Sequence, residues 1–122
     1  MKYDNNNIFA RILRGDLPCQ KISENEYYLA FHDLYPQAPL HALIIPKGAY
    51  SDAFDFHSQA TPTEIMEFYK GINNVIEKLK ISDGYRLVSN SGYQGGQEVP
   101  HYHVHLLAGK KLGPYVQQDK DL

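Results

Sequence analysis

The run His101-Tyr102-His103-Val104-His105-Leu106-Leu107 constrains this chain more than any other stretch. Three histidines alternate with apolar residues, and this alternation has the period of a β-strand, whose successive side chains point to opposite faces. The pattern predicts one strand with all three imidazoles on one face and the apolar side chains on the other. Such a strand has an apolar face to bury and a histidine face to present.

Three interpretations of the histidine face compete. The first is an exposed polar surface, although such a surface accepts Lys, Thr or Glu as readily as histidine. The second is a metal site, because zinc binds imidazole, but the outer two positions lie about 13 Å apart along a strand. The third is nucleophilic and acid–base chemistry at phosphorus, because imidazole changes charge near neutral pH. We favour the third interpretation.

Composition narrows the class of protein. The 122 residues fit one domain, 1–122, and a net charge of −2 without a basic run gives no sign of nucleic-acid binding. The single cysteine, Cys19, excludes an internal disulfide and a multi-cysteine zinc site. No apolar stretch indicates a membrane span, and the polar residues 1–7 are unlike a signal peptide. We therefore expect a cytoplasmic protein that binds neither nucleic acid nor membrane.

Two helices are predicted by their caps and apolar stripes. A short one is expected at 8–14, and a longer one at 62–80, where Thr61 and Glu64 have the spacing of a capping box. The longer helix carries a broad apolar stripe. Gly71 interrupts it at a cost in helix propensity, which suggests close packing at that point.

Five strands are predicted from alternation and from the turn residues between them. They are expected at 19–24, 27–32, 41–46, 85–90 and 101–107, with loops at 33–40 and 47–61. The glycine-rich segment 91–97 is a further loop, whose backbone N–H groups could approach an anion. It ends four residues before the histidine strand, so a phosphate held there would lie against the imidazoles.

These residues resemble the histidine-triad (HIT) superfamily, whose signature is three histidines alternating with apolar residues and followed by a further apolar one. Residues 101–107 match that signature in full. The Hint-type branch is the most similar, over about residues 7 to 109. Further segments fall in family order: Ile8-Phe9, Leu17-Pro18, Phe31-His32-Asp33, Pro36-Gln37-Ala38-Pro39, His41, Ile45-Pro46, Asn90 and Gly95-Gly96-Gln97.

The resemblance implies an α+β fold in a single domain, with a five-stranded, mainly antiparallel sheet, two helices and assembly as a homodimer. It also implies hydrolysis at the α-phosphate of purine nucleoside phosphoramidates or aminoacyl adenylates. The reaction would pass through a nucleotidyl-histidine and release a nucleoside monophosphate. It needs no metal and no other cofactor.

The resemblance also implies roles for single residues. His103 is the nucleophile, and Asp33 binds the ribose hydroxyls. The histidines that orient the nucleophile, contact phosphate oxygens or handle protons are His41, His101 and His105. The side chains that line the base pocket are Phe9, Ile12, Leu17, Phe31 and Leu34. The residues that hold the phosphate are Asn90, Gly96, Gln97 and Glu98.

Other activities stay open. A diadenosine polyphosphate hydrolase of the Fhit type has the same triad, and a zinc hydrolase would use two triad histidines with His41. From another class, a nucleotide-binding interaction protein would show little turnover.

Two features depart from the animal Hint proteins. Glu98 stands where those proteins have a phosphate-binding serine, and the tail 110–122 lacks their tryptophan-containing end. Glu98 is five residues before His103, so strand alternation would turn its carboxylate away from the triad. We therefore expect its backbone N–H, and not its carboxylate, to contact phosphate.

Overall fold

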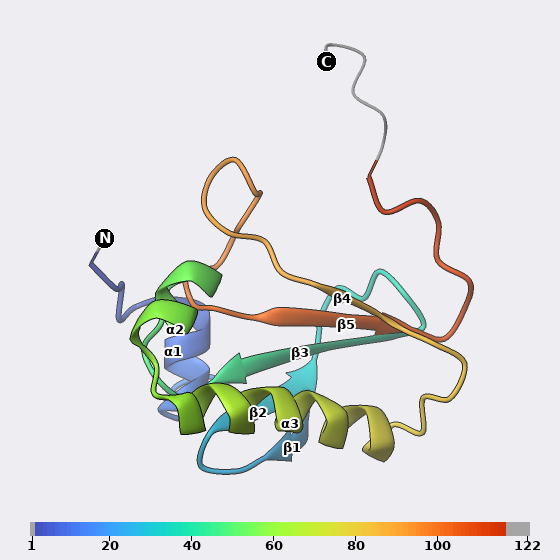
Figure 1. Ribbon diagram of the computed structural model, residues 1–122, viewed down its shortest axis with the longest axis horizontal. Coiled ribbons are helices and arrows are strands. Elements are labelled where there is room, and N and C mark those ends of the chain that lie inside the picture. The colour runs from blue at the N-terminus through green and yellow to red at the C-terminus, as the bar shows by residue number, and fades with distance from the viewer. Residues whose placement is uncertain (1, 117–122) are drawn as a thin grey trace.

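The computed structural model describes residues 2–116, so residue 1 and the last part of the tail, 117–122, lie outside the described residues. Along the chain the elements are α1 (Ile8–Leu13), β1 (Lys21–Glu24), β2 (Tyr28–His32), β3 (Leu40–Pro46), α2 (Ala53–Gln59), α3 (Pro62–Lys78), β4 (Arg86–Val88) and β5 (Val104–Ala108) (Figure 1). This order confirms the α+β class that the resemblance implies.

The strands form one antiparallel sheet in the order β1-β2-β3-β5-β4. Strand β3 lies at its centre and pairs with β5, so that Leu43 stands opposite His105 and His41 opposite Leu107. Residues that face each other across a ladder share one face of the sheet. The register therefore places His41 and His105 on the same face, although 64 positions separate them in the chain.

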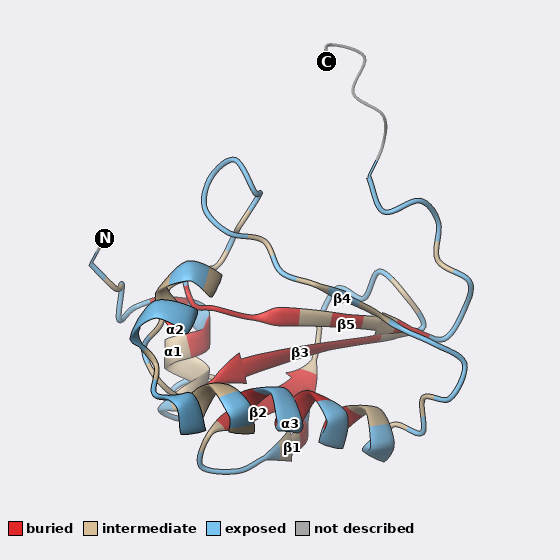
Figure 2. Cartoon of the chain, viewed as in Figure 1, coloured by how far each residue is buried: buried red, intermediate tan, exposed pale blue. Residues whose placement is uncertain are grey.

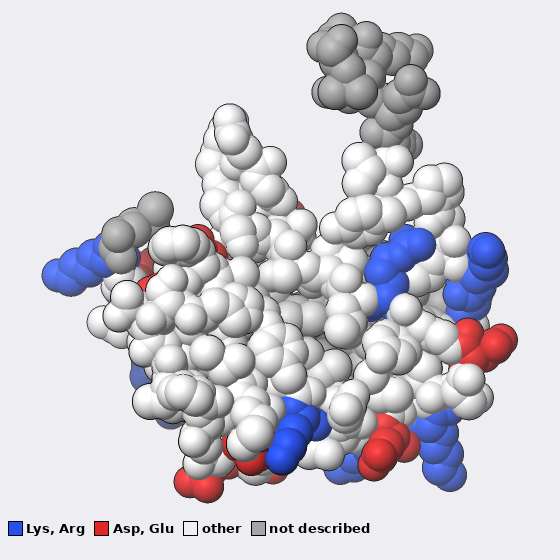
Figure 3. Space-filling model, in the orientation of Figure 1, with Lys and Arg blue, Asp and Glu red and all other residues white. Residues whose placement is uncertain are grey.

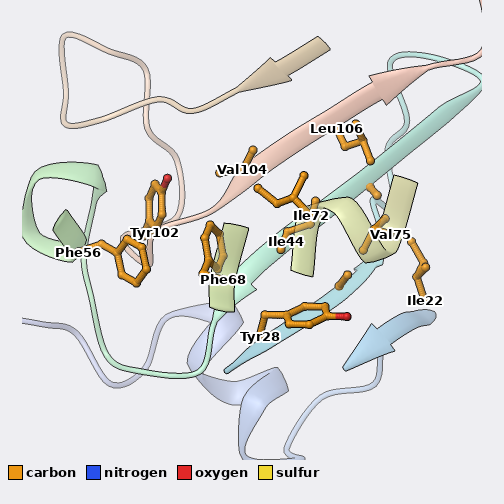
Figure 4. Close-up of a cluster of buried hydrophobic side chains, with 12 residues drawn as sticks. Ile22, Tyr28, Ile44, Phe56, Phe68, Ile72, Val75, Tyr102, Val104 and Leu106 are labelled. Atoms are coloured by element: carbon orange, nitrogen blue, oxygen red, sulfur yellow. The ribbon is translucent and has the colours of Figure 1, made fainter. Parts of the chain in front are cut away.

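The two faces of the sheet are covered differently. Helix α3 packs across β1, β2 and β3 over a core cluster that includes Phe68, Ile72 and Val75 (Figures 2 and 4). Its predicted capping box is present, because the Glu64 N–H donates to Thr61 Oγ1 at 3.1 Å and the Thr61 N–H to Glu64 Oε1 at 3.0 Å. The opposite face holds a smaller cluster built around Phe9 of α1, and the histidines lie on that side.

One prediction is wrong: residues 47–61 are not entirely loop, and the structure between residues 2 and 116 has three helices instead of two. Helix α2 begins after Asp52, whose side chain accepts a hydrogen bond from the Asp55 N–H. Phe56 anchors the helix, since it is 0% exposed and stacks on Tyr102 with ring centroids 5.0 Å apart (Figure 4). Two helical turns with one apolar anchor show too little periodicity to be recognised from sequence.

The strand boundaries also move. The predicted strand 85–90 shortens to Arg86–Val88, and the histidine strand begins at Val104 instead of His101. Pro100 precedes this segment, and proline cannot donate to a ladder. The first two histidines therefore lie in an extended lead-in to β5, outside the paired strand.

The surface shows no single dominant charge. On the face drawn in Figure 3, Lys and Arg are scattered and lie among Asp and Glu. Among residues 2–116, no helix combines the length and the apolar character that crossing a membrane requires.

Candidate active site

The lead-in to β5 places the histidines and the residues between them on opposite sides. The intervening Tyr102 joins the core cluster under α3, as the alternation predicts. On the other side, Phe9 meets His101 and His103 edge to face, with centroids 6.4 and 5.0 Å apart. The rings of His103 and His105 are 5.1 Å apart. The three imidazoles thus form a continuous row next to α1.

His103 has a defined proton position. Its Nδ1 donates to the backbone carbonyl of His101 at 2.7 Å, and a carbonyl can only accept. A neutral imidazole carries one proton, so Nε2 keeps its lone pair. Burial lowers the pKa of His103, against smaller opposing effects of the His101 carbonyl, Asp33 and Glu98. The ring is therefore neutral at pH 7 and has a nucleophilic nitrogen.

His41 and His105 form a second pair with fixed protons. The backbone N–H of Gln37 donates to His41 Nδ1 at 3.0 Å, so the His41 proton sits on Nε2. That Nε2 lies 3.0 Å from Nδ1 of His105, which therefore accepts, and the proton of His105 sits on its own Nε2. Burial, with the charges of His103 and His41, lowers the pKa of His105 to about 4. His105 is thus a neutral ring that presents an N–H donor.

Asp33 completes a cluster that could be taken for a metal site. Potential ligand atoms of Asp33, His41 and His105 all lie within 4.8 Å of one another. An imidazole binds a metal through an unprotonated nitrogen. His41 Nε2 carries its proton as long as Gln37 donates to Nδ1, and this proton faces His105 and, at 3.4 Å, Asp33. The hydrogen bonding therefore suits proton-bearing imidazoles better than metal ligands.

His101, the first histidine of the row, is held by hydrogen bonds inside the protein. It is completely buried, its Nε2 donates to the carbonyl of Pro46 at 3.0 Å, and its Nδ1 lies 2.5 Å from the hydroxyl of Tyr3. Burial lowers its pKa to about 4, against the opposing effect of the Pro46 carbonyl. His101 is not among the cavity-lining residues, so its contacts are with the protein itself.

A cavity of about 300 Å³ lies on the histidine face. Eight of the residues singled out in the sequence line it together: Phe9, Asp33, His41, Asn90, Gly96, Glu98, His103 and His105. The lining residues that sequence reasoning missed are Tyr35, Gln37, Leu43, Val88, Val99 and Leu107. Val88, Leu43 and Leu107 alternate in strands, but alternation alone does not say which face of a strand lines a cavity.

Other residues expected at the site lie outside this cavity's lining. Phe31 is buried in the cluster below Phe9, with Ile12 packed against that cluster. Leu17 is half-buried, and Leu34 is 80% exposed. Gln97 fastens the loop, because its Nε2 donates to the Ser51 carbonyl at 2.7 Å and to the Val99 carbonyl at 2.9 Å.

The glycine-rich loop bends at Gly96, whose φ of 77° lies in the left-handed region that favours glycine. Three of its N–H groups are already used within the loop, and the first is that of Gly92, which donates to Gln97 Oε1 at 2.9 Å. The Gly96 N–H donates to the Tyr93 carbonyl and the Gln97 N–H to the Gly92 carbonyl, at 3.1 and 3.0 Å. No such bond of the Glu98 N–H is found among residues 2–116, so this N–H is available to an anion in the cavity.

Comparison with known proteins places the chain among its relatives. The model of the HIT domain family matches residues 14–112. An uncharacterized HIT-like protein of Azospirillum brasilense is 51% identical over 115 residues, which cover 93% of this chain and 94% of that protein. The purine nucleoside phosphoramidase of Escherichia coli is 40% identical over 111 residues, 88% of this chain and 90% of that enzyme.

A solved structure extends the similarity to three dimensions. A HIT family hydrolase from Legionella pneumophila superposes with a TM-score of 0.81 at 36% sequence identity, over 88% of this chain and 96% of that one.

Proposed function

Because this chain belongs to the HIT family, we propose that it is a hydrolase that cleaves the α-phosphate bond of purine nucleoside phosphoramidates or aminoacyl adenylates. The products are a nucleoside monophosphate and the free amine or acid. A relative with 40% identity bears the name purine nucleoside phosphoramidase, which supports this choice of substrate.

One observation carries the proposal: the cavity holds a neutral imidazole with a free nitrogen beside another imidazole with a free N–H. The first is His103, whose Nδ1 is fixed by the His101 carbonyl. The second is His105, whose Nδ1 is occupied by His41. A nucleophile next to a hydrogen-bond donor is the arrangement that attack on a phosphoryl group needs.

The reaction has two steps. Nε2 of His103 bonds to the α-phosphorus while the bond from phosphorus to the leaving group breaks, and the leaving atom keeps the electron pair. A leaving nitrogen takes up a proton from water, whereas the acyl oxygen of an adenylate leaves as a carboxylate. Water then attacks the same phosphorus, releases the nucleoside monophosphate and a proton, and restores the lone pair on His103. The N–H of His105 and the backbone N–H of Glu98 stabilise the charge on the phosphoryl oxygens.

Nucleoside binding is assigned to Asp33 and Phe9, which line the same cavity as the histidines. The Asp33 carboxylate is the proposed acceptor for the ribose hydroxyls, and its Oδ1 is held by the Tyr35 N–H at 2.8 Å. Phe9 contributes an aromatic surface to the same cavity. Asn90 and Gly96 line it near the histidines and are the proposed phosphate contacts together with Glu98.

The proposed assembly is a homodimer. The edge strand β4 offers unpaired backbone groups, and its Leu87 is 43% exposed. On α3, Met66 is 49% exposed. A second copy of the chain would cover apolar side chains that one copy leaves in water.

Hydrolysis assays test the substrate. Purified protein should release AMP from adenosine phosphoramidate at an undiminished rate in the presence of a metal chelator. Faster cleavage of diadenosine polyphosphate would point to the Fhit type, and a chelator-sensitive rate restored by zinc would overturn the metal-free reaction. Nucleotide binding without turnover would identify an interaction protein.

A His103→Ala variant tests the nucleophile. It should bind nucleotide but lose turnover, whereas the control His57→Gln, which changes an exposed histidine outside the cavity, should keep it. Mass spectrometry after a base quench should find nucleotidyl mass on His103 of the unaltered protein, because phosphohistidine-type bonds survive base. An adduct on another residue would refute the assignment.

A further inference from the structure

Tyr3 lies beside the first histidine of the triad, 98 positions away in the chain. Its hydroxyl is 2.5 Å from His101 Nδ1, and the two rings meet edge to face with centroids 5.7 Å apart. Burial raises the pKa of Tyr3, so the hydroxyl keeps its proton and can donate a hydrogen bond. Tyr3 is not one of the residues that line the cavity, so it has no place in nucleotide binding.

The buried ring of His101 needs this donor. Its Nε2–H donates a hydrogen bond to the Pro46 carbonyl, so the unprotonated Nδ1 has a lone pair. A buried acceptor without a donor is destabilising. Within residues 2–116, the Tyr3 hydroxyl is the donor that meets this lone pair, and no buried side-chain polar atom there is left without a partner.

The same residue holds the proposed nucleophile. The His101 carbonyl accepts from His103 Nδ1 at 2.7 Å and thereby sets which nitrogen of His103 has the lone pair. Strand pairing begins only at Val104, so the β5 ladder does not fix this carbonyl. The peptide that carries this carbonyl is held in two ways: its Tyr102 N–H donates to the Tyr50 carbonyl at 2.8 Å, and the His101 side chain on the same segment is seated by its own hydrogen bonds.

The segment before α1 is itself well anchored. Asn7 donates from its side chain to the Asp4 carbonyl at 2.7 Å, and its Oδ1 accepts from the Ala10 N–H at 2.9 Å as the cap of α1. Phe9 follows in the first turn and packs against His103. Two contacts from one short segment thus reach two successive triad histidines.

We propose that Tyr3 is a positioning residue for the nucleophile: its hydroxyl seats the His101 ring, and through the His101 carbonyl it fixes the orientation and the proton position of His103. The catalytic part of this proposal rests on the hydrolysis proposed above. The part that concerns proton position does not depend on any substrate.

Tyr3→Phe removes the donor and keeps the aromatic ring. Without the donated hydrogen bond, the lone pair of His101 takes up a proton more readily. The titratable groups that face this ring are Tyr3 and His103. A protonated His101 ring would make the His101 carbonyl a weaker acceptor for His103 Nδ1. It would also loosen the position of that carbonyl. Both changes weaken attack by His103 without changing the nucleotide contacts.

Nitrogen-15 NMR of the imidazoles tests proton position without substrate. In the unaltered protein at pH 7.5, His103 should have its proton on Nδ1. In Tyr3→Phe, the His101 Nδ1 resonance should move because its hydrogen bond is lost, and His103 should become a mixture of both tautomers. Unchanged His103 resonances would overturn the proposal, whatever reaction the protein catalyses.

Kinetics test the consequence. Tyr3→Phe should lower kcat about tenfold, keep KM within about twofold, and move the acid limb of the kcat profile to higher pH. The matched control Tyr85→Phe, which removes the hydroxyl of a half-exposed tyrosine outside the cavity, should change none of these. An unchanged kcat and pH profile in Tyr3→Phe, even with a lower Tm, would show that Tyr3 is only structural.

Discussion

At the scale of single residues, the site is defined by where each imidazole keeps its proton. His103 has it on Nδ1, and His41, His101 and His105 have it on Nε2. Three of these positions follow from a backbone group that can only accept or only donate, and that of His105 follows from the proton on His41 Nε2. Burial lowers the pKa of all four rings, so they are neutral at pH 7. The four imidazoles therefore offer both lone pairs and N–H groups without carrying charge themselves.

Activity should persist into mildly acidic solution. Attack needs neutral His103, and a lowered pKa means that this ring takes up a proton only below the ordinary value of 6.5. The acid limb of kcat/KM should therefore fall below pH 6.5, measured as initial rates and corrected for uncatalysed loss of the acid-labile substrate. A half-maximal rate at or above pH 6.5 would contradict this proton assignment.

The carboxylate of Glu98 should contribute little to activity. Its side chain is exposed, and its charge slightly opposes the lowered pKa of His103. Glu98→Ser should change kcat/KM by less than about tenfold, or roughly 1.4 kcal/mol, and should move the acid limb slightly down. Glu77→Ser, an exposed change on α3, is the control. A much larger loss would show a catalytic role for the carboxylate, and a large gain would show that it repels substrate.

At the scale of elements, α3 depends on one close approach to the sheet. A Cβ on Gly71 would stand 2.5 to 2.8 Å from ring atoms of Tyr28, which is almost fully buried in β2. The ring has little room to move away, because it is 1% exposed and belongs to the core cluster (Figure 4). The glycine that interrupts the apolar stripe therefore lets the helix touch the strand.

Gly71→Ala should destabilise the protein even though alanine is the better helix former. The gain in helix propensity is about 1 kcal/mol, whereas overpacking a core costs about 1–3 kcal/mol and more where backbone must shift. Urea unfolding should show a net loss of stability. The control Asn73→Ala, an exposed position two residues on, should leave stability equal or slightly higher. A stabilised Gly71→Ala would mean that α3 can retreat from Tyr28.

At the scale of the whole molecule, the helical cover of the sheet is uneven. Helix α3 packs on β1, β2 and β3, while β4 ends the sheet on the other side of β5. Leu87 stands opposite Leu106 in that ladder, so both point to the α3 side, yet Leu106 is buried and Leu87 is 43% exposed. The uncovered strip next to β4 is where a second copy would add most to the apolar core.

Light scattering at micromolar concentration should give the mass of two chains. Leu87→Lys places a charge on the edge strand and should shift the mass toward one chain, since edge charges oppose strand pairing. The control Leu34→Lys changes a side chain that is 80% exposed and should leave the mass unchanged. A single-chain mass for the unaltered protein would refute the dimer.

Much of this fold could be predicted from sequence because its signals are local. The cap of α3 needs only Thr61 and Glu64, one turn apart, and both hydrogen bonds formed. The alternation of residues 101–107 predicted which side chains enter the core. Helix α2 was not predicted, because its single apolar anchor, Phe56, packs against Tyr102 and belongs to no repeat along the chain.

By itself, the sequence determined that three imidazoles would share one side of a strand, because strand geometry repeats every two residues. Only the tertiary structure decided which of their nitrogens carry protons. Those positions depend on the Gln37 N–H beside His41, on the Pro46 carbonyl and the Tyr3 hydroxyl beside His101, and on the approach of His41 to His105. The protons of His103 and His41 are placed by backbone groups two and four residues before them, but the partners of His101 and His105 come from distant parts of the chain, and no periodicity along the chain encodes them.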